Sequence, residues 1–225
     1  MNRKPVIGIL ATSNYMSNND SFCDTYTFGN NYINKIVENG ATPLLIPYVN
    51  NEIIYEALDM CDGLLLPGGN KILPSALKVI DYFYKKKKPI LGICLGMQSL
   101  AVYSVNDNEK NVIQKIESDI NHWPFEIYRD NNEAVVHDVY VDKNSKLYEV
   151  FNSDVINVNS VHNYMVTEVG NDFKVSIKSS DDVIEGIEYI NDDNFVVGVQ
   201  FHPEILPQFN NLFKVFIHKC RKRQK

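Results

Sequence analysis

Short apolar runs alternate with longer amphipathic segments over the first hundred residues of the chain. The apolar runs predict strands at residues 5–10, 43–47, 63–67 and 89–93, and helical spacing of apolar positions predicts helices at 26–39, 52–59, 75–87 and 95–105. The strands are apolar throughout and do not alternate with polar positions, which is typical of a parallel sheet covered on both faces. The pattern therefore predicts an α/β fold with a central, mostly parallel sheet and helices on both faces.

The pattern changes after about residue 106. Residues 107–119 are mostly polar and are expected to form a loop, whereas short strands are expected at 134–141, 155–158, 173–177, 184–190 and 195–199. Turns rich in Asn, Asp and Gly separate these strands, which indicates antiparallel hairpins added to the parallel core. A final helix is expected from residue 207. No internal repeat or linker interrupts the chain, so we predict a single domain over residues 1–225.

Composition and charge narrow the classes of partner. The chain has 225 residues, 44% of them hydrophobic, and a formal net charge of 22 − 28 = −6, so its average field repels polyanions. Five of the basic residues lie within residues 219–225, where they favour the C-terminal end of a last helix over a contact with nucleic acid or membrane. No apolar run approaches the ~18 residues of a membrane helix, and the apolar run near the N-terminus is too short for a signal peptide. We expect a cytoplasmic protein without nucleic-acid or membrane partners.

The four cysteines, Cys23, Cys61, Cys94 and Cys220, are widely spaced and form no CxxC pair. This spacing argues against a cysteine-based zinc site or a disulfide framework, and it favours a reducing compartment. No metal or organic cofactor is called for by the sequence.

The string PILGICLGMQ at residues 89–98 leads from a buried strand directly into a helix. Gly92, Cys94 and Gly96 form a G-x-C-x-G motif, the cysteine form of a nucleophile elbow, in which a sharp turn holds the nucleophile in a strained backbone conformation. Cys94 is then at a helix N-terminus, where the aligned amides favour a thiolate. The backbone N–H of Leu95 would supply half of an oxyanion hole. Taken alone, the motif also fits a buried core cysteine.

The string FVVGVQFHPE at residues 195–204 ends a second buried strand with His202, Pro203 and Glu204. Pro203 biases His202 toward extended geometry, and residues i and i+2 of an extended chain point the same way. Glu204 can therefore accept the ring N–H of His202, which is how a carboxylate orients a general base.

The string DGLLLPGG at residues 62–69 places two glycines directly after a third strand. The N–H of Gly69 could complete the oxyanion hole, although a simple turn explains the glycines equally well. All three strings end strands at the carboxyl edge of the predicted sheet, where open parallel sheets bind their ligands. It is the occurrence of all three strings at this one edge that indicates an active site.

In this order, the PGG, GICLGMQ and VQFHPE strings resemble the class I glutamine amidotransferase-like superfamily. Within it, the chain is most similar to the peptidase C26 family, which includes the γ-glutamyl-γ-aminobutyrate hydrolases, from residue 5 to about residue 207. The resemblance implies a flavodoxin-like three-layer sandwich, a Cys94–His202–Glu204 triad and an oxyanion hole formed by Gly69 and Leu95.

The resemblance also suggests substrate contacts. Residues 158–162, VNSVH, are similar to the family's VNSxHH stretch, and His137 matches its upstream HxV element. The residues expected at the substrate are Gly68, Gln98, Asn159, Ser160 and His162. For Gln98, helix capping or packing is an equal alternative.

Several positions depart from the family pattern. Leu95 stands where the hydrolases usually have Arg, Asn163 replaces the second His of VNSxHH, and Asn70 changes the GGxDxxP stretch. These positions belong to the expected substrate pocket and not to the triad.

The resemblance and the triad together predict a cysteine-dependent hydrolase. It would cleave the γ-glutamyl amide bond of a small γ-glutamyl compound through a γ-glutamyl thioester, releasing glutamate and an amine. One alternative is a glutaminase subunit that supplies ammonia to a partner synthetase, which Leu95 and Gln98 permit. Another is a binding or redox-sensing protein with an oxidisable Cys94, which leaves the His202–Glu204 pair unexplained. A homodimer remains open. Of the other histidines, His122 is expected either at the edge of the cleft or in a structural loop, and His218 in the last helix without a catalytic role.

Overall fold

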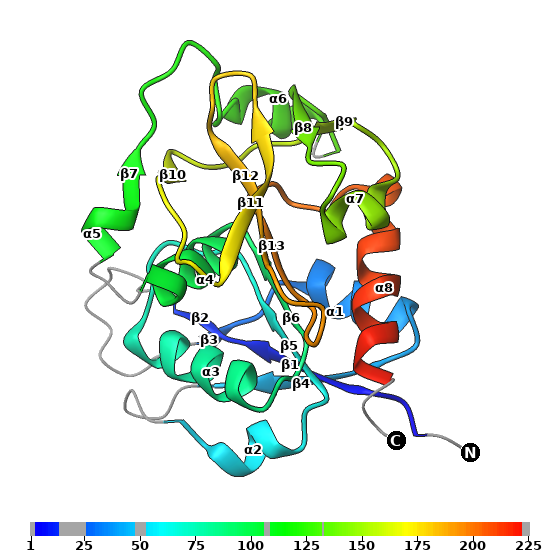
Figure 1. Cartoon of the computed structure of the whole chain (residues 1–225). Coiled ribbons are helices and arrows are strands. Elements are labelled where there is room, and N and C mark those ends of the chain that lie inside the picture. Colours follow the sequence, from blue (N-terminus) through cyan, green and yellow to red (C-terminus); the bar gives the residue numbers. More distant parts are fainter. Residues whose placement is uncertain (1–2, 14–25, 48–52, 106–108, 132, 222–225) are drawn as a thin grey trace, which may run out of the picture.

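The computed structural model describes residues 3–13, 26–47, 53–105, 109–131 and 133–221, and its centre is one nine-stranded sheet (Figure 1). The order of the strands across the sheet is β4-β1-β5-β6-β13-β12-β11-β8-β9. Their bounds are β1 Val6–Leu10, β4 Thr42–Ile46, β5 Gly63–Leu66, β6 Ile90–Ile93, β8 His137–Val141, β9 Val155–Val158, β11 Phe173–Ser179, β12 Ile184–Tyr189 and β13 Val196–Val199.

The sheet has a parallel half and an antiparallel half. Strands β4, β1, β5, β6 and β13 run parallel to their neighbours in this half, and from β13 onward the pairings to β12, β11, β8 and β9 are antiparallel. The antiparallel strands thus extend the same sheet and do not form a separate layer. The predicted α/β fold is confirmed.

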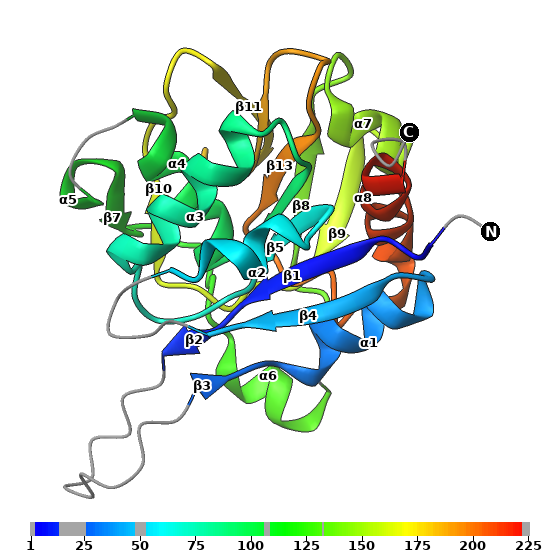
Figure 2. The same ribbon diagram turned by 90° about the horizontal axis from the view of Figure 1, so that it is seen from below.

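Helices cover both faces of this sheet (Figures 1 and 2). Helices α1 (Asn30–Glu38), α7 (Lys146–Phe151) and α8 (Asn210–Arg221) share one hydrophobic core, and α2 (Tyr55–Asp59), α3 (Pro74–Lys85) and α4 (Leu95–Val105) share the other. Successive strand residues alternate between the two cores, as Leu64 and Leu65 do. This is the physical reason why the inner parallel strands β1, β5, β6 and β13 carry no polar side chain.

Several elements differ from those expected. The stretch expected to be a loop at 107–119 holds a short helix, α5 (Glu109–Val112), and β7 (Ile113–Lys115), which pairs with β10 (Tyr164–Val166). The helix expected from residue 26 begins only at Asn30, because β3 (Tyr26–Thr27) pairs with β2 (Thr12–Ser13). Helices α6 (Phe125–Asp130) and α7 were not expected, and a 3-10 turn, Pro207–Phe209, precedes α8.

The C-terminal basic residues fall partly within α8. Lys219 and Arg221 lie in its last turn, as expected for cations at a helix C-terminus, and Lys222, Arg223 and Lys225 lie outside the described residues, as does Cys23. Among the helices that the structure describes, none combines the length and the apolar character needed to span a membrane.

Candidate active site

The three candidate strings come together because they follow three neighbouring strands. β6 lies between β5 and β13, with Leu66 opposite Gly92 on one side and Val199 opposite Ile93 on the other. The backbone N–H of Cys94 continues the ladder by donating to the Val199 carbonyl oxygen at 2.8 Å. The glycine loop, the cysteine and the histidine segment therefore emerge side by side at one edge of the sheet.

Cys94 has the backbone conformation expected of a nucleophile elbow. Its φ is +52°, in the left-handed region that non-glycine residues rarely adopt. The turn is tight: a Cβ atom on Gly96 would lie 2.2 Å from the Leu66 carbonyl oxygen, and one on Gly92 would lie 2.7 Å from the Gly96 carbonyl group. The two flanking glycines are thus required by packing, which confirms the conformation predicted from the G-x-C-x-G motif.

His202 lies between Cys94 and Glu204. Its Nδ1 is 2.7 Å from Glu204 Oε1, and its ring also hydrogen-bonds the Cys94 thiol. Burial alone would lower the pKa of His202, but the charges of Glu204 and Cys94 and their hydrogen bonds outweigh it and raise that pKa well above its usual value. The structure thus brings the three expected triad residues into contact, with a protonated imidazole favoured at neutral pH.

Asn159 holds the backbone of His202. Its side-chain nitrogen donates to the His202 carbonyl oxygen at 3.0 Å, and its side-chain oxygen accepts from the His202 N–H at 2.8 Å. Asn159 is fully buried, and both its amide nitrogen and its amide oxygen are engaged in this two-way contact. Its position argues against the expected contact with substrate and for a role in positioning the histidine.

Gly69 and Leu95 lie next to each other, as an oxyanion hole requires. A Cβ atom on Gly69 would lie 3.0 Å from Leu95 Cδ2. Leu95 is the first residue of α4, so its N–H is one of those at a helix N-terminus that have no acceptor within the helix. Gly68 lies closer to the triad, since its Cβ atom would be 2.9 Å from the His202 ring and 3.5 Å from Cys94 Cβ. The arrangement is compatible with the expected roles, which stay predictions.

Tyr32 reaches the site from α1 and was not expected there. Its hydroxyl accepts the Gly68 N–H at 3.1 Å, and it lies near Glu204. Burial, and then the negative charge of Glu204, raise the pKa of Tyr32 well above its usual value, so the hydroxyl stays protonated. In the sequence, Tyr32 is one of several apolar positions on a helix face and carries no signal that separates it from a core residue.

The remaining expected substrate residues are buried by protein contacts. Gln98 donates from its amide nitrogen to Gln200 Oε1 at 3.1 Å and to the Tyr164 carbonyl oxygen at 3.3 Å. Only its amide oxygen is left for a ligand, which favours the packing interpretation of Gln98.

Ser160 and His162 lie below the surface in a second polar cluster. The Ser160 hydroxyl donates to the His122 carbonyl oxygen at 2.9 Å, and His162 Nε2 lies 3.4 Å from the fully buried carboxylate of Glu185. Both side chains are at most 3% exposed, so the expectation that they contact the substrate directly is not supported. The cluster also contains His122 and His137.

Comparisons with known proteins identify the family of the chain. The sequence model of the Peptidase C26 family matches residues 5–79 and 75–204, which together span most of the chain. A putative glutamine amidotransferase of Schizosaccharomyces pombe, PB2B2.05, is 31% identical over an alignment covering 86% of this chain and 84% of that protein. The γ-glutamyl-γ-aminobutyrate hydrolase PuuD of Escherichia coli is 26% identical over 89% of this chain and 85% of its own.

Among solved structures, a putative GMP synthase protein from Thermoplasma acidophilum superposes with a TM-score of 0.70 at 20% identity, covering 99% of this chain and 96% of that one. That likeness shows the fold of the class I glutamine amidotransferases. The sequence matches go further and place the chain among enzymes that hydrolyse C–N bonds. The chain belongs to the peptidase C26 family.

Proposed function

We propose that the protein is a cysteine-dependent hydrolase that cleaves the γ-glutamyl amide bond of a small γ-glutamyl compound. The observation that carries this proposal is the position of His202, which is shared between Cys94 at the elbow and Glu204 at 2.7 Å. Similarity to a γ-glutamyl-γ-aminobutyrate hydrolase over 89% of the chain supports the γ-glutamyl group as the part of the substrate that is recognised.

In the first half of the reaction, Cys94 Sγ attacks the γ-carbonyl carbon of the substrate. The thiolate is the nucleophilic form of a cysteine. The N–H groups of Leu95 and Gly69 receive the negative oxygen of the tetrahedral intermediate, and one such donor typically contributes about 10²–10³ in rate. His202 then gives its proton to the leaving nitrogen, the C–N bond breaks, and the amine departs from a γ-glutamyl thioester.

In the second half, water takes the place of the amine. His202, now neutral, accepts a proton from the water molecule as the oxygen attacks the thioester carbonyl carbon. The C–S bond breaks, glutamate is released and the Cys94 thiolate is restored beside the protonated His202. Glu204 keeps the ring oriented and stabilises its charge in both halves.

The test is turnover of a panel of γ-glutamyl amides and glutamine by the purified protein. We expect glutamate release from at least one γ-glutamyl amide, and loss of that activity by at least about 10³-fold in Cys94→Ala. Cys61→Ala, which removes another buried thiol, is the matched control and should retain activity. With hydroxylamine present, the thioester should yield γ-glutamyl hydroxamate. Equal turnover in the wild type and Cys94→Ala would refute the mechanism.

A second candidate is a glutaminase that supplies ammonia to a partner synthetase. It is favoured by the 31% identity to a putative glutamine amidotransferase and by Leu95, where the hydrolases usually carry Arg. Under this alternative the panel would show turnover of glutamine alone, at a rate that rises on addition of the synthetase. Turnover of other γ-glutamyl amides without any added protein selects the hydrolase.

A further inference from the structure

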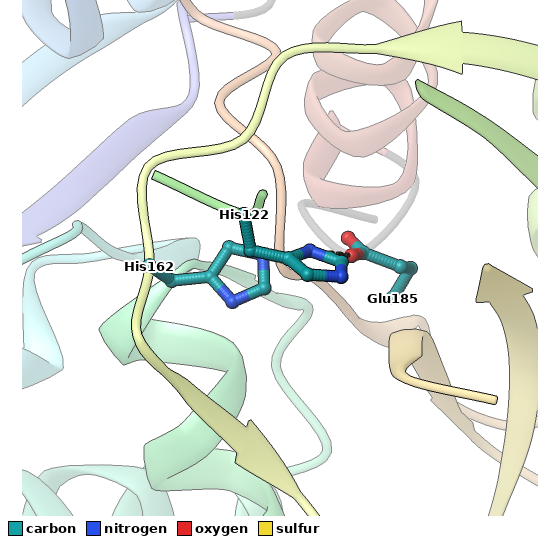
Figure 3. Close-up of side chains that lie close together, drawn as sticks. All are labelled: His122, His162 and Glu185. Carbon is teal, nitrogen blue, oxygen red and sulfur yellow. Dashed lines mark ion pairs between the residues drawn. The ribbon is translucent and has the colours of Figure 1, made fainter. Parts of the chain in front are cut away.

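A buried carboxylate surrounded by histidines lies in the antiparallel half of the fold, apart from the triad. Glu185 on β12 is fully buried, and neither of its carboxylate oxygens has a hydrogen-bond partner among the described residues. An isolated charge in such a place is costly, so carboxylates of this kind are paired or bind a metal. Figure 3 shows His122 and His162 facing Glu185.

The distances from Glu185 to His122 and His162 are close to those between ligands that share one ion. Glu185 Oε1 lies 3.4 Å from His162 Nε2, 3.5 Å from His122 Nδ1 and 3.7 Å from His137 Nε2. Separations of this size make weak or no direct hydrogen bonds. Two ligands that are each 2.0–2.1 Å from a tetrahedral ion are about 3.4 Å apart. The ligand atoms of His122, His162 and Glu185 all lie within 4.8 Å of one another.

The opposite ring nitrogens of His122 and His162 are each held by an acceptor. His122 Nε2 is 3.0 Å from Asp181 Oδ2, and His162 Nδ1 is 3.1 Å from the Tyr164 carbonyl oxygen. Since these oxygens can only accept, the ring proton lies on that side, and the lone pair of the other nitrogen faces Glu185. Metal-binding histidines are oriented by this type of outer contact, including the carboxylate–histidine pair.

Hydrogen bonds between the described residues do not satisfy this arrangement, because both Glu185 oxygens and His162 Nε2 have no hydrogen-bond partner. His122 Nδ1 has a second neighbour, Ser160 Oγ at 3.2 Å, but the one proton of that hydroxyl already goes to the His122 carbonyl oxygen at 2.9 Å. A single divalent ion between His122, His162 and Glu185 would satisfy these three groups at once.

We propose that His122, His162 and Glu185 form a zinc-binding site, with water completing the coordination of the ion. Two imidazole nitrogens and one carboxylate oxygen in a buried set match the ligands of Zn²⁺, whereas Ca²⁺ and Mg²⁺ need more oxygen ligands. A surface pocket of about 280 Å³ lined by Ser118, His122, Trp123 and His162 gives the ion a route to the site.

The site has a structural role in this proposal. His162 and Asn159 lie on the same short connection between β9 and β10, and Asn159 holds both backbone groups of His202. An ion bound by His162 therefore fixes the segment that positions the catalytic histidine. Its three protein ligands include no residue of the triad, so no step of the hydrolysis passes through it.

The test is zinc binding to the whole chain after removal of metal with a chelator. Isothermal titration calorimetry and native mass spectrometry should find one Zn²⁺ per chain. Binding should raise the Tm by about 5–10 °C at free zinc 100-fold above Kd. Cobalt(II) should give the intense visible bands of a four-coordinate site without the near-ultraviolet band of a thiolate ligand.

Substitutions of the proposed ligands test where the zinc ion binds. His162→Gln and Glu185→Gln should weaken zinc binding by at least about 100-fold, and Asp181→Asn, which changes only an outer contact, by about 10–100-fold. His218→Gln, an exposed histidine on α8, is the matched control and should bind zinc like the wild type, as should Cys94→Ala.

Three outcomes overturn the proposal: less than one zinc per chain at saturation, unchanged affinity in His162→Gln, or loss of binding in Cys94→Ala, which would place the ion at the triad. If the ligand variants fail to fold, the cobalt spectrum of the wild type decides, because a thiolate band, or no visible band, also contradicts the site. None of these readouts depends on hydrolytic activity, so the zinc site can fail while the proposed function stands.

Discussion

His202 is positioned by contacts from both its side chain and its backbone. Glu204 holds the ring at Nδ1, and the Asn159 amide binds the N–H and the carbonyl group of the same residue. A residue distant in the sequence thus limits how the imidazole can turn relative to Cys94. Two predictions separate the side-chain contact from the backbone contact.

Replacement of Asn159 tests the backbone contact. Asn159→Ala leaves the His202 N–H without its acceptor and the His202 carbonyl oxygen with only the Ile205 N–H at 3.3 Å, so we expect the free energy of unfolding to fall by about 1–3 kcal/mol. With the imidazole less fixed, kcat should fall by about 10–100-fold and KM should change little. Steady-state kinetics and urea unfolding measure both effects. Asn157→Ala, an exposed asparagine on β9, should change neither; an intact kcat in Asn159→Ala would refute the positioning role.

Replacement of Glu204 tests the side-chain contact through pH. The negative charge of Glu204 raises the pKa of His202, so its removal in Glu204→Gln lowers that pKa toward or below the usual 6.5. His202 must be protonated to release the amine, and the alkaline limb of kcat/KM should therefore move to lower pH. An alkaline limb at the same pH in both proteins would show that another group controls it.

The same pKa shift affects stability. Because the pKa of His202 is higher in the folded than in the unfolded state, its protonation stabilises the fold fully below the unfolded value. That contribution is lost as the pH rises through the folded value. Glu204→Gln should reduce this pH dependence of the free energy of unfolding, and urea unfolding from pH 6 to pH 9 measures it.

At the scale of elements, the turn from β6 to α4 is tightly packed at Gly96. A methyl group at residue 96 would overlap the Leu66 carbonyl oxygen, so α4 must move away from β5 to accept it. We expect Gly96→Ala to lower the free energy of unfolding by about 3 kcal/mol and to reduce activity together with stability. Ser99→Ala, one turn further along α4, removes only a hydroxyl bonded to the Leu95 carbonyl oxygen and should cost about 1 kcal/mol. Equal losses in the two variants would contradict the tight elbow.

The parallel half of the fold could be predicted because its signals are local. The apolar runs of β1, β5 and β6 lie within a few residues of their predicted bounds, and α4 has the predicted bounds, Leu95–Val105. Gly40, which follows Asn39 at the end of α1, has φ +79°, the left-handed conformation in which a glycine commonly ends a helix. Continuous apolar strands and terminating glycines carry this information in short stretches of sequence.

The elements that were missed depend on contacts between distant residues. Helix α7 has only six residues, and its first N–H groups are accepted by Ser145 and by the carboxylate of Glu188, which reaches it from β12. β7 and β10 are three-residue strands paired across about fifty residues of chain. No local sequence pattern predicts such elements, because an isolated helix or strand of this length is not stable by itself.

The candidate site follows the same division. Cys94, His202 and Glu204 were identified from local motifs, and the structure brings them into contact. The contacts of Tyr32 with Gly68 and of Glu185 with the histidines could not be predicted, because the partners are distant in the sequence and only the fold brings them together. In the sequence, both look like ordinary positions of an amphipathic helix and a strand.

At the scale of the whole molecule, the sheet separates two hydrophobic cores that we expect to unfold together. Phe216 belongs to the core under α8 and Phe83 to the core under α3, and both side chains are fully buried. Phe216→Ala and Phe83→Ala should each lower the free energy of unfolding by about 3–5 kcal/mol. The circular dichroism and Trp123 fluorescence transitions should coincide in both variants. Two separate transitions would contradict the prediction of a single domain.

The division of the sheet has a consequence for how such a chain can diverge. The cysteine elbow and the glycine loop follow strands of the parallel half, while Ser160, His162 and Glu185 belong to the antiparallel half. Insertions or exchanges in the latter leave β5, β6 and α4 unchanged, and with them the attacking sulfur atom. A chimera carrying the antiparallel half of a relative would therefore keep its own cysteine elbow, but it must retain Asn159 to keep the backbone of His202 in place.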